Sequence, residues 1–369
     1  MPDCDVAIIG AGVIGGSIAY ELASRGATVS LFDSRGAGLG ATQAAAGMLV
    51  PYIEGFGRPI LAMAARSLGM YDGFIERVAR DSGIDVGYQR TGSLQVALAD
   101  EPIDGLIATA ACADAAGIRC TLLDGKQARD ADPQLSPDVR SGLLIPDHGF
   151  VVAIGLLGAL LAAAIKRGAL VRAPERVGRI SRRDEGVELQ LEGERMNARH
   201  VVLAAGSWSG QVEITGVPPL PVRPVRGQLL ELSSGGPPLA RITWGSRCYL
   251  VPAAPGSVLV GATVEDAGFD ERPTVAGVHD LLDAASDLVP SLRQAAFAGV
   301  RVGLRPAAPD GLPIIGRSKQ VPSLVYATGH FRNGVLLAPL TARVVADLVL
   351  ENREDAVLST TSPQRFGEY

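Results

Sequence analysis

CDVAIIGAGVIGGSIAYELASRGATVSLFD (residues 4–33) decides the fold of this chain. Its apolar run Val6–Ile9 is typical of a strand buried on both faces. The glycine-rich turn GAGVIG at 10–15 follows, then a helical pattern at about 14–24 and a second apolar run at 29–32 that ends on Asp33. Strand, glycine turn, helix, strand and acid in this order predict a Rossmann-type unit that binds an adenine dinucleotide.

Each glycine of the turn has an expected task. Gly10 permits the tight turn, Gly12 lets a pyrophosphate approach the backbone, and Gly15 lets the helix pack on the strand. The helix start is expected to face the phosphates with unpaired N–H groups and a positive dipole end. Asp33 is placed to accept hydrogen bonds from ribose hydroxyls and would repel a 2′-phosphate, so the ligand should be FAD or NAD and not NADP. A unit whose glycines serve packing alone is the alternative.

Composition excludes several classes of protein. The chain has 369 residues and a net charge of −5 without a long basic run, which argues against nucleic acid as a partner. Cys4, Cys112, Cys120 and Cys248 show no metal-binding spacing and are expected to be reduced thiols of a cytoplasmic protein. The start of the sequence does not resemble a signal peptide. The apolar stretch 151–165 is too short for a bilayer and is expected to be a buried helix.

Two kinds of segment alternate along the rest of the chain. Strands near 200–205 and 324–327 run into glycine turns like the first strand does, and a final helix is expected at about 339–351. The predicted fold is α/β with an inserted α+β part, namely a Rossmann-like FAD-binding domain and a mainly antiparallel substrate domain. The expected boundaries are 1–82, 151–220 and 301–369 for the discontinuous FAD-binding domain, and 83–150 and 221–300 for the substrate-binding domain.

Six motifs in order carry a resemblance to a known family. They are GAGVIGGSIAYELA, ATQAAAGML, VVLAAGSWSG, RPVRGQLL, GLRPAAPDGLPIIG and ATGHFRNGVLLAP. The chain resembles the D-amino-acid oxidase family of flavoproteins, and in particular its glycine oxidase branch of the thiamine pathway, over nearly its whole length. The resemblance implies non-covalent FAD, two-electron oxidation of a small amine, and oxygen as acceptor. No second GxGxxG for NAD(P)H is found, so the electrons should come from the substrate itself.

Three residues are candidates for binding the substrate. Arg305 ends a predicted strand, and its guanidinium offers a two-pronged match to a carboxylate. The resemblance implies that the Tyr249 hydroxyl donates to the same carboxylate and that Arg332 lies over the mouth of the site or near the flavin. The alternatives are a structural ion pair or a surface position for Arg305, a place in the core for Tyr249, and a solvated loop position for Arg332.

Three further residues are expected to line the substrate pocket. By resemblance Met48 packs beside the isoalloxazine. By the same resemblance, Arg247 stands where glycine oxidases have a histidine-bearing pattern, x-His-x-Tyr. Val264 stands where the family often has methionine. These two departures leave carboxylate binding intact, but they make a bulkier or acidic substrate an open alternative.

The cofactor contacts implied by the resemblance come from separate segments. Val177 is expected to contact adenine through its backbone, and the start of the last helix is expected to face the flavin's pyrimidine oxygens and stabilise the reduced ring. The full set is Gly10, Gly12, Val13, Ile14, Gly15, Asp33, Ser34, Arg35, Thr42, Gln43, Ala46, Gly47, Met48, Val177, Ala205, Gly206, Trp208, Arg305, His330, Phe331, Arg332, Asn333, Gly334, Val335 and Leu336.

These expectations lead to one predicted function and several alternatives. The expected activity is oxidative deamination of glycine, sarcosine or a small D-amino acid to the 2-oxo acid, ammonia and hydrogen peroxide, by a homo-oligomer that contains no metal. The nearest alternative is a D-amino-acid dehydrogenase or a sarcosine-type oxidase of the same fold. More distant ones are a non-catalytic or RNA-modifying FAD protein, and an NAD-linked dehydrogenase that would purify colourless.

Overall fold

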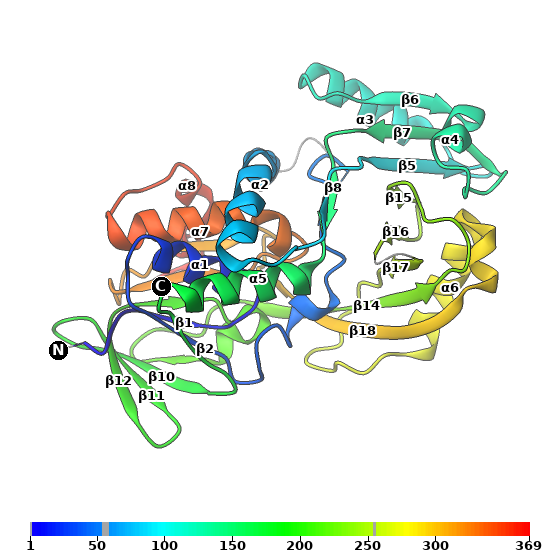
Figure 1. Ribbon diagram of the computed structural model, residues 1–369. Helices are drawn as coiled ribbons and strands as arrows, with labels where there is room; N and C mark the ends of the chain where they lie inside the picture. Colours follow the sequence, from blue (N-terminus) through cyan, green and yellow to red (C-terminus); the bar gives the residue numbers. More distant parts are fainter. Residues whose placement is uncertain (1, 54–58, 254–255) are drawn as a thin grey trace.

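The computed structural model describes residues 2–53, 59–253 and 256–369. Two large sheets lie at opposite ends of the molecule, with helices packed against each (Figure 1). One has nine strands, the other has eight, and a small three-stranded sheet is formed by β3 (Met48–Leu49), β8 (Gly149–Val151) and β4 (Tyr88–Gln89). The predicted fold class, a dinucleotide-binding α/β fold with a mainly antiparallel second sheet, is confirmed.

The nine-stranded sheet has a parallel centre. Its strands are apolar and buried on both faces, as expected where helices and strands cover a parallel sheet. The parallel strands are, in order, β9 (Leu170–Arg172), β2 (Val29–Phe32), β1 (Cys4–Ile9), β12 (Arg195–Leu203) and β20 (Leu324–Thr328). β12 also pairs with β11 (Val187–Leu191), and β10 (Val177–Arg182) and β13 (Glu213–Ile214) follow beyond β11 in the sheet. β19 (Ile314–Arg317) pairs with β20.

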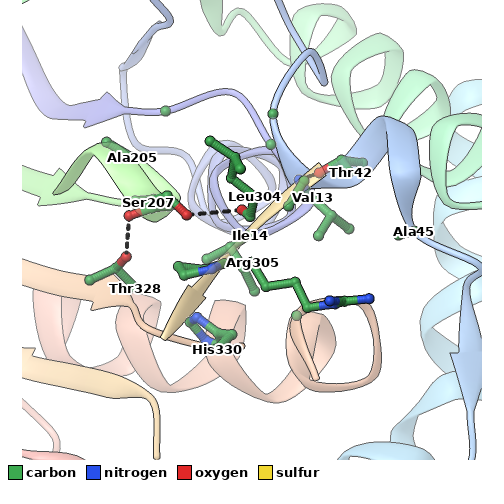
Figure 2. Close-up of a pocket in the computed structure, with 18 of the residues that line it drawn as sticks. Val13, Ile14, Thr42, Ala45, Ala205, Ser207, Leu304, Arg305, Thr328 and His330 are labelled. Carbon is green, nitrogen blue, oxygen red and sulfur yellow. Dashed lines mark hydrogen bonds between the residues drawn. The ribbon is translucent and has the colours of Figure 1, made fainter. Parts of the chain in front are cut away.

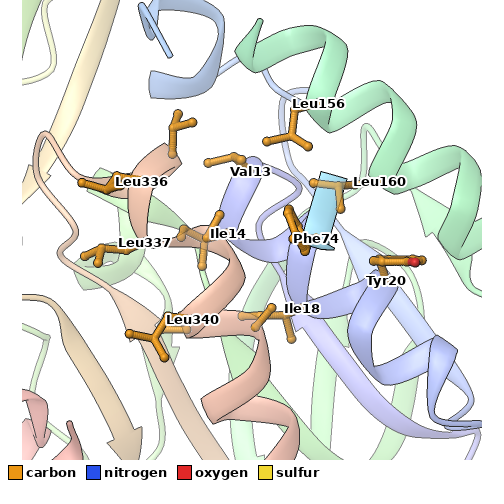
Figure 3. Packing of buried hydrophobic residues seen from close by; sticks show 14 of the residues in the cluster. Val13, Ile14, Ile18, Tyr20, Phe74, Leu156, Leu160, Leu336, Leu337 and Leu340 are labelled. Atoms are coloured by element: carbon orange, nitrogen blue, oxygen red, sulfur yellow. The ribbon is translucent and has the colours of Figure 1, made fainter. Parts of the chain in front are cut away.

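Four helices cover one face of this sheet. They are α1 (Val13–Ser24), α2 (Leu61–Ser82), α5 (Ala153–Lys166) and α7 (Gly334–Leu350). Figure 3 shows side chains of α1 packed between those of α5 and α7. The apolar stretch near 151–165 is therefore a core helix, as predicted, and no helix among the described residues is both long and apolar enough to cross a bilayer.

The last helix begins five residues earlier than the sequence predicts. The expected start at Pro339 was wrong, because this proline lies inside α7. Proline has no N–H with which to bond the carbonyl four residues earlier, which usually breaks a helix. Here the buried Tyr71 hydroxyl of α2 donates to that carbonyl, on Val335, and Ser67 donates to the next carbonyl, on Leu336. Tertiary contacts thus replace the missing hydrogen bond and let α7 begin at the cavity described below.

The eight-stranded sheet is antiparallel except for one parallel pair, β15 with β5. Its helix α6 (Val275–Leu288) shares a core cluster with it, and α3 (Asp104–Ala115) and α4 (Gly125–Ala131) lie at its far edge (Figure 1). The strand order is β18 (Ala296–Ala307), β14 (Arg223–Ser233), β17 (Ser257–Gly261), β16 (Tyr249–Pro252), β15 (Ile242–Trp244), β5 (Ser93–Leu98), β7 (Val139–Ile145) and β6 (Thr121–Asp124).

Each large sheet collects its strands from separate parts of the chain. The nine-stranded sheet takes strands between residues 4–32, 170–214 and 314–328, and the eight-stranded sheet takes them between 93–145, 223–261 and 296–307. The division into two discontinuous domains stays a prediction, and its boundary at 301 falls within β18.

Candidate active site

A cavity of about 580 Å³ runs between the two sheets. This volume lies in the range of about 300–1,000 Å³ that is usual for ligand sites. The glycine turn after β1 and the residues after β2 line one end, called here the dinucleotide end. Residues of β16 and β18 line the other, called here the substrate end. The cavity therefore lies at the carboxyl edge of the parallel strands, where α/β folds bind their ligands.

The dinucleotide end is shaped by Gly10 and Asp33. Gly10 has φ +109°, and a Cβ there would lie 2.3 Å from the Ala204 carbonyl oxygen of the neighbouring strand's end. The Asp33 carboxylate lines the cavity, and it also accepts hydrogen bonds from the backbone N–H groups of Ala11 (2.8 Å) and Arg35 (2.9 Å). Asp33 thus fixes the turn as well as facing the ligand, a structural task that the sequence did not reveal.

The first N–H of α1 is already paired. The Val13 N–H donates to the buried Thr42 hydroxyl at 3.0 Å, so the expectation of wholly unpaired N–H groups at this helix start was wrong. Thr42 belongs to the small-residue loop predicted to approach the ligand, and the bond draws that loop against the glycine turn. Thr42 lines the same cavity as Gly12 and Val13.

An aromatic and ionic group closes the side of the dinucleotide end. The Arg35 guanidinium lies 4.7 Å from the centre of the Trp208 ring and forms an ion pair with Glu271 at 2.9 Å. Phe269 packs against Trp208, with ring centres 5.8 Å apart. The loop between β17 and α6 therefore reaches the dinucleotide end as well as the substrate end, where its residue Val264 lines the cavity.

The turn between β20 and α7 closes the cavity from the C-terminal side. Phe331 has φ +48°, and its N–H donates to the Pro306 carbonyl at 2.8 Å, which holds the turn to β18. His330 lies 3.1 Å from the Thr341 hydroxyl, and burial lowers its pKa to about 3, so the imidazole is neutral. The start of α7 at Asn333 and Gly334 lines the cavity and presents its positive dipole end there.

Arg305 is held by backbone carbonyls at the substrate end. Its Nη1 donates to the Thr263 carbonyl at 2.9 Å and to the Arg226 carbonyl at 3.3 Å. Gly227 of β14 leaves the space that the Arg305 guanidinium occupies, because a Cβ on residue 227 would lie 2.2 Å from Arg305 Nη2. Figure 2 shows Arg305 among the cavity residues, near His330. These two backbone carbonyls thus fix the direction of the guanidinium at this end of the cavity.

Tyr249 lines the same end of the cavity from β16. It pairs across the sheet with Gly261, where a Cβ would lie 2.3 Å from the Tyr249 ring, and it packs against Trp244 with ring centres 5.1 Å apart. Burial raises the pKa of Tyr249, against the opposing charges of Arg305 and Arg332. The hydroxyl is therefore protonated at neutral pH and able to donate a hydrogen bond.

Arg332, Met48 and Val264 complete the substrate end. The Arg332 guanidinium lies 5.4 Å from the centre of the Phe331 ring, within the turn before α7. All three residues line the cavity, and their contacts with a ligand stay predictions. The Val264 side of the wall is open, since 58% of that residue is exposed.

Three predicted site residues do not line the cavity. Arg247 was expected in the substrate pocket, but it precedes β16 in a turn and pairs with Asp283 (2.8 Å) and Asp287 (2.9 Å) of α6. Gln43 turns away and donates to the Leu39 carbonyl. Gly15 packs beneath the Gly10 carbonyl, where a Cβ would lie 1.8 Å from that oxygen, so its role is the packing of α1 on β1.

The other predicted residues all line the cavity, together with several that the sequence did not suggest. Trp244 was missed because β15 has only three residues, too few for a strand pattern. Its aromatic side chain, five residues before Tyr249 in the chain, was the available signal. The additional lining residues include Trp244, Ala262, Glu175, Arg176 and Ser207.

A comparison with models of protein families gives one match over most of the chain. A family model described as FAD dependent oxidoreductase, DAO, matches residues 5–348. The chain belongs to this family.

Relatives of known structure or activity agree with that assignment. A glycine oxidase of Geobacillus kaustophilus is 35% identical over 95% of this chain and 94% of its own. A crystal structure of glycine oxidase from that species superimposes with a TM-score of 0.94, at 34% identity and 99% coverage of both chains. An iminodiacetate oxidase from Chelativorans sp. BNC1 superimposes with a TM-score of 0.89 at 30% identity, covering 97% of this chain and 98% of that one.

A fused relative matches over part of its length. The bifunctional protein ThiO/ThiG of Nostoc sp. PCC 7120 is 36% identical over 96% of this chain. The match covers 54% of that protein, so this chain spans about half of it.

The cavity fits the FAD that this family of oxidoreductases uses. The fit rests on a cradle that side chains would fill at Gly10, and on the start of α7, whose positive end faces the cavity. Ser207 donates to the Leu304 carbonyl at 2.9 Å and so joins the turn after β12 to the residue before Arg305 (Figure 2). Among the residues that the structure describes, no group of three or more metal-ligating side chains is found.

Proposed function

We propose that this enzyme oxidises glycine or another small amino acid, consuming oxygen and water and releasing the 2-oxo acid, ammonia and hydrogen peroxide. The observation that carries the proposal is the pair Arg305 and Tyr249, a cation and a protonated hydroxyl at one end of an FAD-sized cavity. Together they can bind one carboxylate through charge-assisted hydrogen bonds. The names of the relatives support the same class of substrate.

The residues at the substrate end act by orientation. FAD held in the cavity would supply the acceptor for a hydride from the carbon that bears the amine, with oxygen as the final electron acceptor. Arg305 fixes the carboxylate of the amino acid, and Tyr249 fixes the angle of that group, so that the C–H bond has one direction. Arg332, from the turn before α7, adds positive charge at the same end of the cavity.

No base at the reacting carbon is needed for this chemistry, and the described cavity lining offers none there. Its acids are Asp33, Glu175 and Glu192, and all three belong to the dinucleotide end. The Glu175 N–H donates to the Asp33 carbonyl, and Glu192 follows the strand residue paired with Val177. His330 stays neutral and is bonded to Thr341. Hydride transfer needs the lone pair of a neutral amine, so the amino acid would lose its ammonium proton to water before it reacts.

The wider role follows from the relatives and from surface chemistry. The likeness to ThiO/ThiG supports a role in supplying an intermediate for the thiazole of thiamine. All four cysteines are free thiols, which supports a cytoplasmic location. The outward face of α5 carries the exposed apolar residues Ile154 and Ile165, which supports a homo-oligomer. Size measurement in solution tests the last point.

The function is tested by one spectrum and one substrate panel. Adding glycine without air should bleach the flavin band of the purified protein, and admitting air should restore it. Oxygen uptake with glycine, sarcosine, D-alanine and D-proline then separates an oxidase from a dehydrogenase, which would need an artificial acceptor. A yellow protein that none of these amines bleaches would refute the proposal.

A further inference from the structure

The loop between β17 and α6, residues 262–274, is called here the clasp loop. The buried Arg226 of β14 holds it at three points. Its Nε donates to the Glu265 carboxylate at 3.1 Å, and its Nη1 donates to the backbone carbonyls of Asp270 at 3.4 Å and Arg272 at 3.2 Å. The backbones of Arg226 and Glu265 also exchange hydrogen bonds of 2.9 and 3.0 Å. A guanidinium with this many partners fixes the clasp loop to the eight-stranded sheet.

Between these anchors the clasp loop presents two side chains to the dinucleotide end. Phe269 packs against Trp208, with ring centres 5.8 Å apart, and Glu271 Oε2 pairs with Arg35 at 2.9 Å. Glu271 Oε1 is buried and has no hydrogen-bond partner among the residues that the structure describes, so the pair with Arg35 is what orients this carboxylate. The Arg35 guanidinium in turn lies 4.7 Å from the centre of the Trp208 ring. The four side chains therefore form one connected group.

This group stands at the wall of the dinucleotide end. Arg35 and Trp208 line the main cavity, whereas Phe269 and Glu271, both within the described part of the chain, do not. A second hollow of about 290 Å³ is lined by Arg35 and Glu271, so Arg35 lies between this hollow and the main cavity. The clasp loop thus supports the wall from behind, through the two residues that form it.

We propose that Phe269 and Glu271 are positioning residues that retain FAD by holding Trp208 and Arg35 in the wall of the dinucleotide end. Arg35 follows β2 and Trp208 follows β12, both in the nine-stranded sheet, while the clasp loop is anchored on the eight-stranded one. The contact therefore joins the two sheets beside the cofactor. Weakening it should let this part of the wall open more often and let FAD leave sooner. The inference rests on the cofactor of the family and not on the amine that is oxidised.

The experiment measures FAD release from the full-length holoprotein. Phe269→Ala, Glu271→Gln and the double variant remove the two contacts. Phe297→Ala on β18 is the matched control for the ring, because Phe297 is 52% exposed and Phe269 is 44% exposed. Asp266→Asn is the control for the charge, because it removes an exposed pair of the same loop, with Arg223 at 3.6 Å. Flavin fluorescence after dilution gives the release rate, and titration of the apoprotein with FAD gives the dissociation constant.

The expected effects follow from the kind of contact that each variant loses. An aromatic pair and a partly exposed ion pair are both modest interactions, so each single variant should release FAD about threefold faster than the parent, and the double variant about tenfold faster. Phe297→Ala and Asp266→Asn should stay within about 1.5-fold of the parent. A double variant whose release rate is within twofold of the parent, or lower, would overturn the inference.

A double-mutant cycle with Arg35 separates positioning from a general loosening of the loop. If Glu271 acts through Arg35, Glu271→Gln should weaken FAD binding about threefold in the parent but by less than about 1.5-fold in Arg35→Met. A loosened loop would weaken binding by the same factor in both backgrounds, and that result would overturn the task assigned to Glu271. The titration starts from apoprotein, so the cycle can be measured even where Arg35→Met purifies without flavin.

Discussion

The two ends of the cavity are built in different ways. The dinucleotide end consists largely of backbone groups from short contiguous stretches, such as the turn at 10–15 and the residues after Asp33. The substrate end consists of side chains from several strands, and two of its partners, Arg226 and Arg305, are 79 positions apart. A site of backbone groups should tolerate many side-chain changes but not an added Cβ, whereas a site of side chains should depend on each of them.

The largest expected effect is at the dinucleotide end. Gly10→Ala forces φ +109° on a residue with a Cβ, which would also lie 2.3 Å from the Ala204 carbonyl. We expect protein without flavin, with FAD affinity reduced at least about 100-fold, a loss of roughly 3 kcal/mol. Absorbance of the purified protein and titration with FAD measure it.

Gly158→Ala is the control for that change, because Gly158 lies in α5 with nothing near its would-be Cβ. It should keep its flavin and gain about 0.5–1 kcal/mol of stability from helix propensity. Parent-like FAD affinity in Gly10→Ala would refute the distinction between the two ends.

Arg305→Ala should show the next largest effect, confined to the substrate end. Loss of the guanidinium should raise the KM for glycine by about 100-fold or more, equivalent to roughly 3 kcal/mol, while the protein stays yellow. Arg305→Lys should fall between, since it keeps the charge but not the two-pronged geometry. Steady-state oxygen uptake measures KM.

Arg301→Ala on the same strand is the matched control. Arg301 pairs with Glu231 and both are partly exposed, so KM should change by less than about twofold. An unchanged KM for glycine in Arg305→Ala would refute the assignment of Arg305 as the residue that binds the carboxylate.

Gly227→Ala tests the same end by adding a methyl group and removing no functional one. The new Cβ would lie 2.2 Å from Arg305 Nη2, so the guanidinium must move. We expect KM for glycine to rise about 30-fold, equivalent to about 2 kcal/mol, with FAD still bound. Gly299→Ala on β18, with nothing within 4 Å of its would-be Cβ, should have no such effect. If Gly227→Ala lost its flavin and kept its affinity for glycine, this result would contradict the distinction between the two ends of the cavity.

His330 should affect stability more than substrate affinity. Its folded-state pKa of about 3 lies below the ordinary value of 6.5, so the unfolded chain binds the extra proton and stability falls as pH drops below about 6.5. At pH 5.5 the loss from this group is about 1.4 kcal/mol relative to pH 8. Thermal unfolding against pH measures it.

His330→Asn should flatten that pH dependence, and His279→Asn should not, because His279 is exposed on α6. The buried His148, with a pKa also lowered to about 3, contributes a similar slope that remains in both variants. Equal slopes in all three proteins would contradict the neutral, buried state of His330.

The smallest effect is expected from Tyr249→Phe. Removing one hydroxyl should raise KM for glycine about fivefold, equivalent to about 1 kcal/mol, because Arg305 still binds the carboxylate. Since burial raises the pKa of Tyr249, the hydroxyl stays protonated and the ratio of variant to parent KM should be constant between pH 6 and 9. A ratio that falls with rising pH would show that the hydroxyl ionises in this range.

The sequence predicted most of the dinucleotide end. Glycine positions and the order of strand, turn and helix are local properties, and Gly10, Gly12 and Asp33 lie where they predict. At the substrate end Arg305 and Tyr249 were found with the help of resemblance, but Arg247 was misplaced. It lies two residues before Tyr249, yet it pairs with Asp283 and Asp287 of α6, because the turn before β16 directs its side chain to that helix.

Local patterns suffice to predict the Rossmann unit, the buried helix near 151–165 and a dinucleotide cofactor, because hydrophobic period and glycine placement act over a few residues. The start of α7 depends instead on a tertiary contact, the Tyr71 hydroxyl that replaces a missing proline N–H. The tertiary structure also decided that Arg226 and Glu265 pair beside Arg305. Those contacts depend on strand register and on neighbours far away in the chain, and no local pattern records them.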